Sequence, residues 1–320
     1  MSLKDSSIVI ALLARDCATA LKANIQSVEL LGSMFKEYHV MVYENNSVDG
    51  TKEVLADWQR QNSNVTAIME DLTEEKSTER LPYPEKSTCR IQKMVHCRNR
   101  ILEETRKRFE PDLFCLIDID IERFDAYSIV NAIENAPADW GGIFANGAYY
   151  ARYSTHEQPH YLQYDTYAYV DQGVDPMKSK DWITKRDYHL VTASRMTWKL
   201  RHHPYVPCQS AFGGIGVYRW DIIKEQNYAT IQTPELKPVK AALCEHVPFN
   251  TAITKKGYAN YIARDMKVVY GTEPAKEKKG INRWQNHYRA LYYFHARPRK
   301  AVKTLWHIVK ERLGMYPYAK

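Results

Sequence analysis

The sequence predicts an α/β protein with a mostly parallel sheet and helices on both of its faces. Short apolar segments alternate with longer segments whose apolar residues recur at helical spacing, and polar turns separate them. This alternation is typical of strand–helix–strand units, which form parallel sheets. Two of the apolar segments also end directly in acidic residues, as strands do at the ligand-binding edge of open α/β sheets.

The first half of the chain carries the regular alternation. Ser7–Ala14 is a continuous apolar segment rich in Ile and Val, which predicts a strand buried on both faces. Asp71–Thr88 is charged and contains Pro82 and Pro84, so we expect a surface loop there. The expected strands are 7–14, 39–43, 65–69, 113–117 and 140–144, and the expected helices are 18–31, 51–61, 91–109 and 128–135.

The regular pattern fades after residue 148. Tyr149–Tyr169 holds seven tyrosines, of which we expect one or two to stack on sugar rings and the others to pack. Further along, the pattern predicts a glycine-bearing strand at Ala211–Arg219, a helix at 248–256 and short strands at 259–262 and 267–269.

The net charge of +7 belongs to the end of the chain. Residues 275–320 carry 12 Lys and Arg against 2 Asp and Glu, whereas the remainder has a slight acidic excess. This distribution argues against a nucleic-acid-binding body, and no nucleic-acid partner is expected. Between Pro298 and Gly314 the tail also has an apolar stripe at helical spacing. It predicts a helix that either lies on an anionic membrane surface through residues 284–314 or docks on the body.

The six cysteines form no CxxC pair, which fits a reducing compartment better than a secreted disulfide framework. The apolar run Ile8–Ala14 is short for a signal-peptide core and too short to span a bilayer. We therefore expect a cytoplasmic protein without a transmembrane helix, peripheral on the inner face of the membrane if the tail binds lipid.

The segment Phe114–Asp120 carries the sharpest local signal. An apolar strand runs directly into Asp118 and Asp120, whose i, i+2 spacing points both carboxylates to one face of an extended chain. Two carboxylates this close repel each other. A hard divalent cation such as Mg²⁺ or Mn²⁺ relieves that repulsion and would in turn hold a diphosphate. The alternative is a solvated strand end with aspartate caps.

A second polar cluster follows the strand expected at 39–43. Glu44, Asn45 and Asn46 crowd its end, where an acid can accept hydrogen bonds from a base or a ribose hydroxyl. The following residues are turn-forming, and an Asx turn that caps the next helix explains Asp49 equally well.

Three further candidates lie on other predicted elements. Arg98 and Asn99 would meet a phosphate or a base if they face the sheet edge, and would belong to a basic outer helix face if they do not. The pair Gly213-Gly214 would let the backbone approach a sugar closely, or it marks a bulged edge strand. Glu245 and His246 open the helix near 248, where the alternative for His246 is packing beside a helix cap.

Four of these segments occur in the order found in GT-A glycosyltransferases. They are a first strand ending at Ala14-Arg15, the ENNSVDGT turn, the CRNR helix and the LIDIDI strand. The chain resembles family-2-like transferases and the Anp1 and capsule mannosyltransferases. The resemblance implies a Rossmann-like GT-A domain over 1–272, with a nucleotide-binding half (1–145) and an acceptor-binding half (146–272), followed by a basic helical tail over 273–320.

The resemblance also assigns roles to residues. Asp118 and Asp120 would bind Mn²⁺ or Mg²⁺ on the diphosphate. Glu245 would be the general base of an inverting enzyme, or orient the substrates of a retaining one. His246 departs from the common Glu-Asp pair and would bind the metal or the diphosphate. The donor-binding residues would be Ala14, Arg15, Glu44, Asn45, Asp49, Arg98, Ile119, Gly213 and Gly214.

The implied reaction moves a hexose from a UDP- or GDP-linked sugar to a hydroxyl of a glycan or lipid-linked glycan, in surface polysaccharide synthesis. A sugar-nucleotide nucleotidyltransferase is one alternative, but it would show a glycine-rich basic loop after the first strand, and Leu13–Ala18 has no glycine. A non-catalytic GT-A-like binding protein is the other. The presence of Asp118, Asp120 and Glu245 argues against it.

Overall fold

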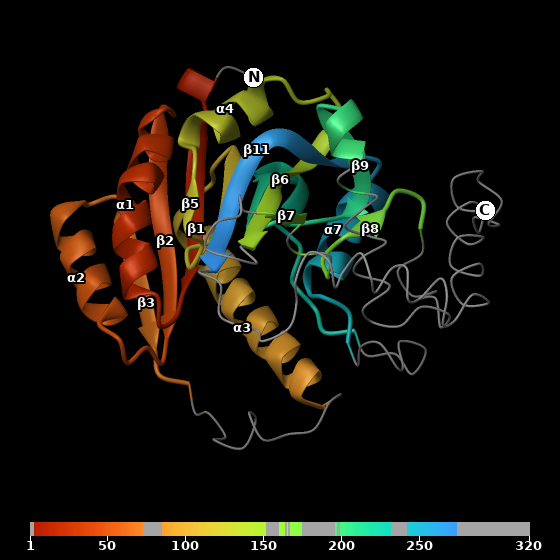
Figure 1. Ribbon diagram of the computed structural model, residues 1–320. Helices are drawn as coiled ribbons and strands as arrows, with labels where there is room; N and C mark the ends of the chain where they lie inside the picture. The colour runs from red at the N-terminus through yellow and green to blue at the C-terminus, as the bar shows by residue number, and fades with distance from the viewer. Residues whose placement is uncertain are drawn as a thin grey trace.

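The computed structural model describes residues 3–72, 85–151, 160–163, 165, 167–174, 196, 199–231 and 242–273. These residues form one sheet of eleven strands, with helices packed on its faces (Figure 1). The strand order is β3-β2-β1-β4-β10-β6-β11-β9-β8, while β5 pairs with β11 and β7 with β6. Strands β10 and β9 run against their neighbours on this path, and the others run the same way. The α/β class with a mostly parallel sheet is confirmed.

The first half of the sheet follows the predicted alternation closely, because its apolar segments are long and its turns are polar. Its strands are β1 (Ser7–Ala14), β2 (Glu37–Asn45), β3 (Val65–Glu70) and β4 (Leu113–Asp118). Its helices are α1 (Ala18–Ser33), α2 (Thr51–Gln61), α3 (Glu85–Arg108) and α4 (Ala126–Glu134), preceded by a 3₁₀ turn, η1 (Leu3–Asp5).

The second half is built around one long strand. Its strands are β5 (Arg123–Phe124), β6 (Trp140–Ala151), β7 (His160–Gln163), β8 (Val170–Asp171), β9 (Tyr205–Ser210), β10 (Ile215–Arg219) and β11 (Ala259–Glu273), and its helices are α6 (Trp220–Ile223) and α7 (His246–Lys255). Strand β11 pairs in parallel with β6 and antiparallel with β9 and β5, so it joins most of this half.

Several elements differ from the sequence prediction, and β5, β7, β8 and α6 were not predicted. Helix α3 begins at Glu85, inside the expected loop, because a glutamate just after a proline suits the first turn of a helix. The expected strand Ala211–Arg219 is a turn followed by β10. The two short strands expected at 259–262 and 267–269 are one strand, β11, with a register shift between Ile262 and Lys267. Strand β9 was not predicted, since its burial alternates around Pro207 without a continuous apolar run.

The core lies in two layers, one on each face of the sheet. Alternate residues of β1 divide between them: Ile8, Ile10 and Leu12 pack on the side of α1, α2 and α4. Val9 and Ala11 pack on the side of α3, α6 and α7. This division explains why β1 is apolar at every position from Ile8 to Ala14.

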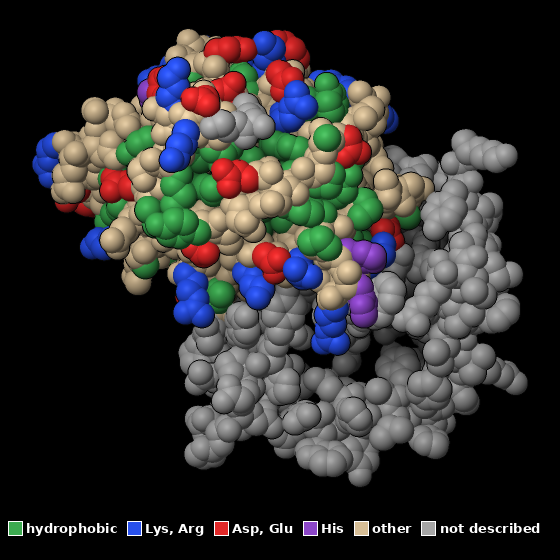
Figure 2. Space-filling model, turned by 90° about the horizontal axis from the view of Figure 1, so that it is seen from above, with side chains coloured by type: hydrophobic (Ala, Val, Ile, Leu, Met, Phe, Trp, Pro, Cys, Tyr) green, Lys and Arg blue, Asp and Glu red, His purple; other side chains and the backbone are tan. Residues whose placement is uncertain are grey.

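The carboxyl ends of β1, β2 and β4 lie on one edge of the sheet, beside α3 (Figure 1). Figure 2 shows the opposite edge from above. On its described part, acidic and basic side chains are interspersed with hydrophobic ones, so neither charge gathers there.

The predicted basic tail, including the membrane-binding segment 284–314 and the helix from Pro298, lies outside the described residues. The division of the chain at residues 145 and 272 stays a prediction. Within the described residues, no helix combines the length and the apolar character needed to cross a bilayer.

Candidate functional site

A cavity of about 330 Å³ opens at the carboxyl edge of the parallel strands. Strand β1 contributes Leu13 and Ala14, with Arg15 just beyond its end, and β2 contributes Asn45. Strand β4 ends at Asp118, and Asp120 lies in the turn that follows. The other lining residues are Arg90, Ile91, Lys93, Met94, Cys97 and Arg98 of α3, Asp165 and Tyr167 of the tyrosine-rich stretch, and Phe212, Cys244, Glu245, His246 and Tyr270.

The two aspartates predicted to bind a metal both line this cavity. Burial raises the pKa of Asp118 to about 7; the Arg98 guanidinium opposes this shift and Asp120 adds to it. Partial loss of solvent around the cavity likewise raises the pKa of Asp120, while the Tyr270 hydroxyl, which donates to its Oδ2 at 3.3 Å, opposes the shift. The site therefore holds two carboxylates in an environment that disfavours their negative charge.

Arg98 lies on the inner face of α3 and is almost fully buried. Its Nε donates to Oε1 of Glu245 at 3.0 Å, and its Nη2 lies 3.5 Å from Oδ1 of Asp118. Aromatic rings flank the guanidinium, with its central carbon 5.0 Å from the Phe212 ring centre and 5.8 Å from that of Tyr228. The arginine thus joins the two acids that the sequence placed in different halves of the chain.

His246, at the start of α7, is also buried in the cavity wall. Its ring stacks on Phe212 with centres 3.9 Å apart and meets the Tyr228 ring edge-on at 5.6 Å. Neither ring nitrogen has a hydrogen-bond partner among the described residues. Burial, together with the Arg98 charge, pushes the pKa of His246 well below 6.5, so the imidazole is neutral at physiological pH.

Three cationic side chains line the cavity in addition to Arg98. Arg90 and Lys93 come from the first half of α3, and Arg15 follows β1. Burial lowers the pKa of Lys93, and the charge of Arg15 lowers it further. Sequence reasoning had selected Arg15 and missed the other two, although residues 90, 93/94 and 97/98 recur at helical spacing on one face of α3.

Asp165 is a further acid that sequence reasoning missed. Its carboxylate accepts hydrogen bonds from the backbone amides of Gly213 and Ala168, each at 3.3 Å. Burial, followed by the charge of Glu245, raises its pKa to about 6. It lies in a stretch without helical or strand periodicity, so no sequence pattern marked it.

Five of the predicted donor-binding residues do not line the cavity: Glu44, Asp49, Ile119, Gly213 and Gly214. Asp49 instead accepts hydrogen bonds from the Ala18 amide (3.0 Å) and from the Thr51 amide (3.1 Å) and hydroxyl (2.6 Å). It thereby links the turn after β2 to the first turn of α1, and these contacts fit the Asx-turn alternative.

Glu44 and Ile119 are fully buried. One carboxylate oxygen of Glu44 accepts from the Ser47 amide at 2.7 Å, which shapes the same turn. The two glycines serve internal packing. A β-carbon on Gly213 would lie 2.3 Å from the Ala145 carbonyl oxygen, and one on Gly214 would lie 3.3 Å from Val268. Asn99, the alternative phosphate ligand, hydrogen-bonds the backbone of Tyr228.

The chemistry of the donor set fits a hard divalent cation. Among the described residues, no group of three His, Cys, Asp or Glu side chains is arranged to hold a metal on its own. Asp118 and Asp120 offer two carboxylates in one cavity, and Mg²⁺ is commonly held by one or two carboxylates together with substrate phosphates and water. Asp118 is half-buried and Asp120 is exposed at the cavity, and a cation bound between them would balance their negative charge.

This sheet order, together with an acid pair and several cations around one cavity at its strand ends, places the chain among α/β proteins of the GT-A glycosyltransferase type. The family model described as Cryptococcal mannosyltransferase 1 matches residues 7–269, and the chain belongs to this family. The resemblance to capsule mannosyltransferases is thus confirmed, and the family is one of glycosyltransferases by its description. Among curated proteins, none matches the chain.

The solved structures to which the chain is similar include the following two. One is mannosyltransferase PcManGT from Pyrobaculum calidifontis in complex with GDP-Man and Mn²⁺, with 12% identity and a TM-score of 0.46 over 89% of this chain. The other is S. aureus TarS 1–349, with 12% identity and a TM-score of 0.44 over 84% of this chain. The chain spans 61% of the length of each.

Proposed function

We propose that this protein transfers a hexose from a nucleoside diphosphate sugar to a hydroxyl of a glycan or lipid-linked glycan, in surface polysaccharide synthesis. The description of its family supports mannose as the hexose. UDP and GDP are the nucleotides proposed for the donor. The family match favours this reaction over nucleotidyl transfer, the first alternative.

The proposal rests on one observation: a pair of carboxylates and a set of positively charged side chains line the same cavity. Asp118 and Asp120 lie at the end of β4, while Arg15, Arg90 and Lys93 line the same cavity from the end of β1 and from α3. A diphosphate held by a divalent cation requires both sets of groups: carboxylates for the cation, and cations for the remaining phosphate oxygens.

Asp118 and Asp120 would hold Mn²⁺ or Mg²⁺, which when bound would neutralise the diphosphate leaving group. Arg15, Arg90 and Lys93 would attract the phosphate oxygens directly. Ala14 and Asn45 line the cavity at the ends of β1 and β2 and would lie towards the nucleoside. Glu44 and Asp49 would act indirectly, by shaping the turn that holds this edge.

His246 supports a sugar substrate. A neutral imidazole offers one hydrogen-bond donor and one acceptor, and both are without partners among the described residues. A sugar hydroxyl, which donates and accepts, complements such a ring. The Phe212 and Tyr228 rings around it hold the imidazole in place. We propose that His246 binds a hydroxyl of the donor or acceptor sugar.

Glu245 is proposed as the acid on the acceptor side. It lines the cavity, and Arg98 holds its Oε1 at 3.0 Å, which fixes the direction of the carboxylate. It would serve as the general base if configuration is inverted, or orient the substrates if it is retained.

The proposal is tested by incubating the protein with GDP- and UDP-linked hexoses, with and without Mn²⁺, and analysing the products. Release of GDP or UDP with a new glycoside, or with free hexose when no acceptor is present, is expected. Formation of pyrophosphate would indicate the nucleotidyltransferase. If no product forms from any of these donors, the result would favour the second alternative, a non-catalytic GT-A-like binding protein.

Asp120→Asn tests the metal assignment. It is expected to abolish transfer while leaving the fold intact, because it removes a carboxylate from the proposed cation site. Glu122→Gln is the matched control, since Glu122 is exposed and does not line the cavity. Turnover of the Asp120→Asn protein at the wild-type rate would refute the metal assignment.

A further inference from the structure

Two acids and two aromatic rings hold Arg98 in place. Its side chain is 3% exposed, two aromatic rings flank its guanidinium, and it contacts one acid at 3.0 Å and another at 3.5 Å. Its remaining nitrogen, Nη1, is buried without a hydrogen-bond partner among the described residues. A large movement of the guanidinium towards a phosphate would break its hydrogen bond to Glu245, so Arg98 is best placed to act on the two acids.

The charges of this group do not balance. Arg98 carries one positive charge, whereas the two acids that it contacts, Glu245 and Asp118, can carry two negative charges. An arginine stays protonated even when buried, so its positive charge is permanent. An acid that is partly removed from water is costly without a counter-charge, so Arg98 favours the charged form of the half-buried Asp118.

The two contacts of Arg98 are unequal. The bond to Glu245 is at an ordinary hydrogen-bonding distance, whereas the approach to Asp118 is at the outer limit of one. The Glu245 carboxylate is thus oriented by Arg98, while the Asp118 carboxylate is attracted to it and retains capacity to bind another cation.

We propose that Arg98 is a positioning residue that holds Glu245 permanently and shares Asp118 with the divalent cation, as an internal competitor of that cation. This role rests on the proposed function, because it assumes that Asp118 binds a metal. It adds a consequence which that function does not contain: the positive charge of Arg98 weakens metal binding while its hydrogen bond to Glu245 sustains transfer.

Loss of the Arg98 charge should therefore change metal binding and catalysis in opposite directions. Arg98→Met removes the charge and keeps an apolar stem between Phe212 and Tyr228. We expect Mn²⁺ to bind the free protein on the order of tenfold more tightly, because a nearby positive charge has gone. Transfer should fall by on the order of a hundredfold, because Glu245 is no longer oriented. A purely structural role would weaken both.

Mn²⁺ binding to the substrate-free protein is measured by electron paramagnetic resonance or calorimetry, beside circular dichroism as a check on folding. Arg98→Lys keeps the charge but cannot make both contacts, so Mn²⁺ affinity should stay near the wild-type value while transfer falls. Glu245→Gln releases Arg98 towards Asp118 and should weaken Mn²⁺ binding. These two variants decide the question if Arg98→Met does not fold.

The outcomes separate the two proposals. If Asp120→Asn binds Mn²⁺ as the wild type does, the metal site of the proposed function is wrong, and the role of Arg98 fails with it. If Asp120→Asn loses Mn²⁺ but Arg98→Met binds it no more tightly than the wild type, only the competition is overturned. If Arg98→Met does not fold, unchanged Mn²⁺ affinity in Glu245→Gln overturns it equally.

Discussion

Asn99 holds Tyr228 by both polar groups of that residue's backbone. Its Nδ2 donates to the carbonyl oxygen at 3.0 Å, and its Oδ1 accepts from the amide nitrogen at 2.8 Å. The Tyr228 ring in turn stacks on Phe249 at 4.1 Å and meets His246 edge-on. Helix α3 therefore positions, through a neighbour of Arg98, the aromatic residues behind the cavity.

Asn99→Ala should lower the free energy of unfolding by about 1–3 kcal/mol, because it leaves two backbone groups of Tyr228 without partners. Urea unfolding measures this. Asn135→Ala is the control, since Asn135 makes its contacts on the exposed end of α4 and should change stability by less than about 0.5 kcal/mol. Equal losses in the two variants would contradict a special role for Asn99.

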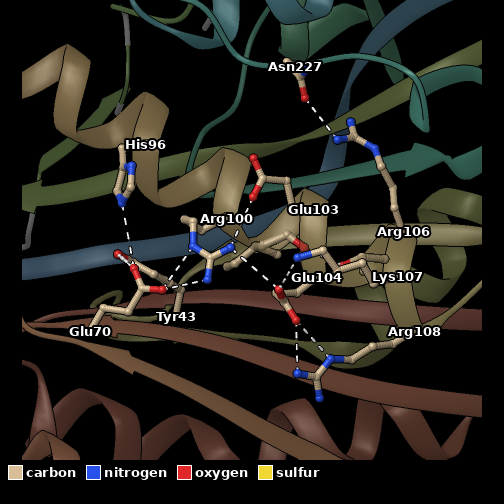
Figure 3. Close-up of polar contacts among 12 residues, drawn as sticks. Tyr43, Glu70, His96, Arg100, Glu103, Glu104, Arg106, Lys107, Arg108 and Asn227 are labelled. Carbon is tan, nitrogen blue, oxygen red and sulfur yellow. Dashed lines mark hydrogen bonds and ion pairs between the residues drawn. The ribbon is translucent and has the colours of Figure 1, made fainter.

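Another face of α3 contacts β3. There Glu70, at the end of β3, accepts three hydrogen bonds (Figure 3). Arg100 donates two of them, at 3.0 and 2.7 Å, and the Tyr43 hydroxyl donates the third at 2.9 Å. Glu70→Ala should destabilise the protein by about 1–3 kcal/mol, since Tyr43 and Arg100 lose their acceptor.

Glu103→Ala is the matched control for Glu70→Ala, because Glu103 contacts Arg100 too, from a more exposed position. Its effect should be below about 0.5 kcal/mol, as for other surface ion pairs. Both values are obtained from denaturant unfolding at neutral pH. A larger loss for Glu103→Ala than for Glu70→Ala would show that α3 is not anchored to β3 in this way.

Gly213 and Gly257 both have positive φ angles, 65° and 89°, but only Gly213 is crowded. A β-carbon at Gly213 would lie 2.3 Å from the Ala145 carbonyl oxygen, whereas one at Gly257 would meet nothing within 4 Å. Gly257→Ala should cost about 1–2 kcal/mol, from the backbone conformation alone. Gly213→Ala should cost clearly more or prevent folding, and comparable thermal stability of the two variants would contradict this packing.

His246→Phe keeps an aromatic ring against Phe212 and removes the two unpartnered nitrogens. The free energy of unfolding should stay the same or rise, because a buried polar group without partners is lost. Transfer should fall, because the proposed hydroxyl contact is lost. Strong destabilisation with unchanged transfer would show that the imidazole has internal hydrogen bonds instead.

The difference in stability between the wild type and His246→Phe should also depend on pH. The pKa of His246 is lower in the folded protein than in the unfolded chain, so the unfolded chain binds the extra proton. The wild type should therefore lose stability relative to His246→Phe as the pH falls below about 6.5, and above it the difference between the two proteins should not change with pH. Thermal unfolding between pH 5 and pH 8 checks the sign.

Metal binding should depend on pH through Asp118. Its pKa is raised to about 7, so part of the population must release a proton before the carboxylate can bind a cation. The apparent Mn²⁺ affinity should rise from pH 6 to pH 8, as measured by calorimetry. Asp118→Asn should bind Mn²⁺ weakly at both values, and an unchanged pH dependence in that variant would assign the proton to another group.

Local patterns in the sequence determined the first half of the sheet and its helices. Helix α2 has the predicted bounds, Thr51–Gln61, and β1 those of Ser7–Ala14, because apolar periodicity and turn residues act over a few neighbouring positions. The same locality made Asp118 and Asp120 recognisable, since an i, i+2 pair at the end of a buried strand shows in the sequence alone.

Only the tertiary structure decided which side chains meet. Arg98 pairs with an acid 147 residues away, and Asp165 enters the cavity from a stretch without periodicity. Conversely, Glu44 and Asp49 lie at the end of β2 and just after it, as predicted from the sequence, but their carboxylates accept hydrogen bonds that shape the turn there. The physical reason is that a pattern sets the face on which a side chain lies, whereas its partner depends on which strand ends and helices the sheet order brings together.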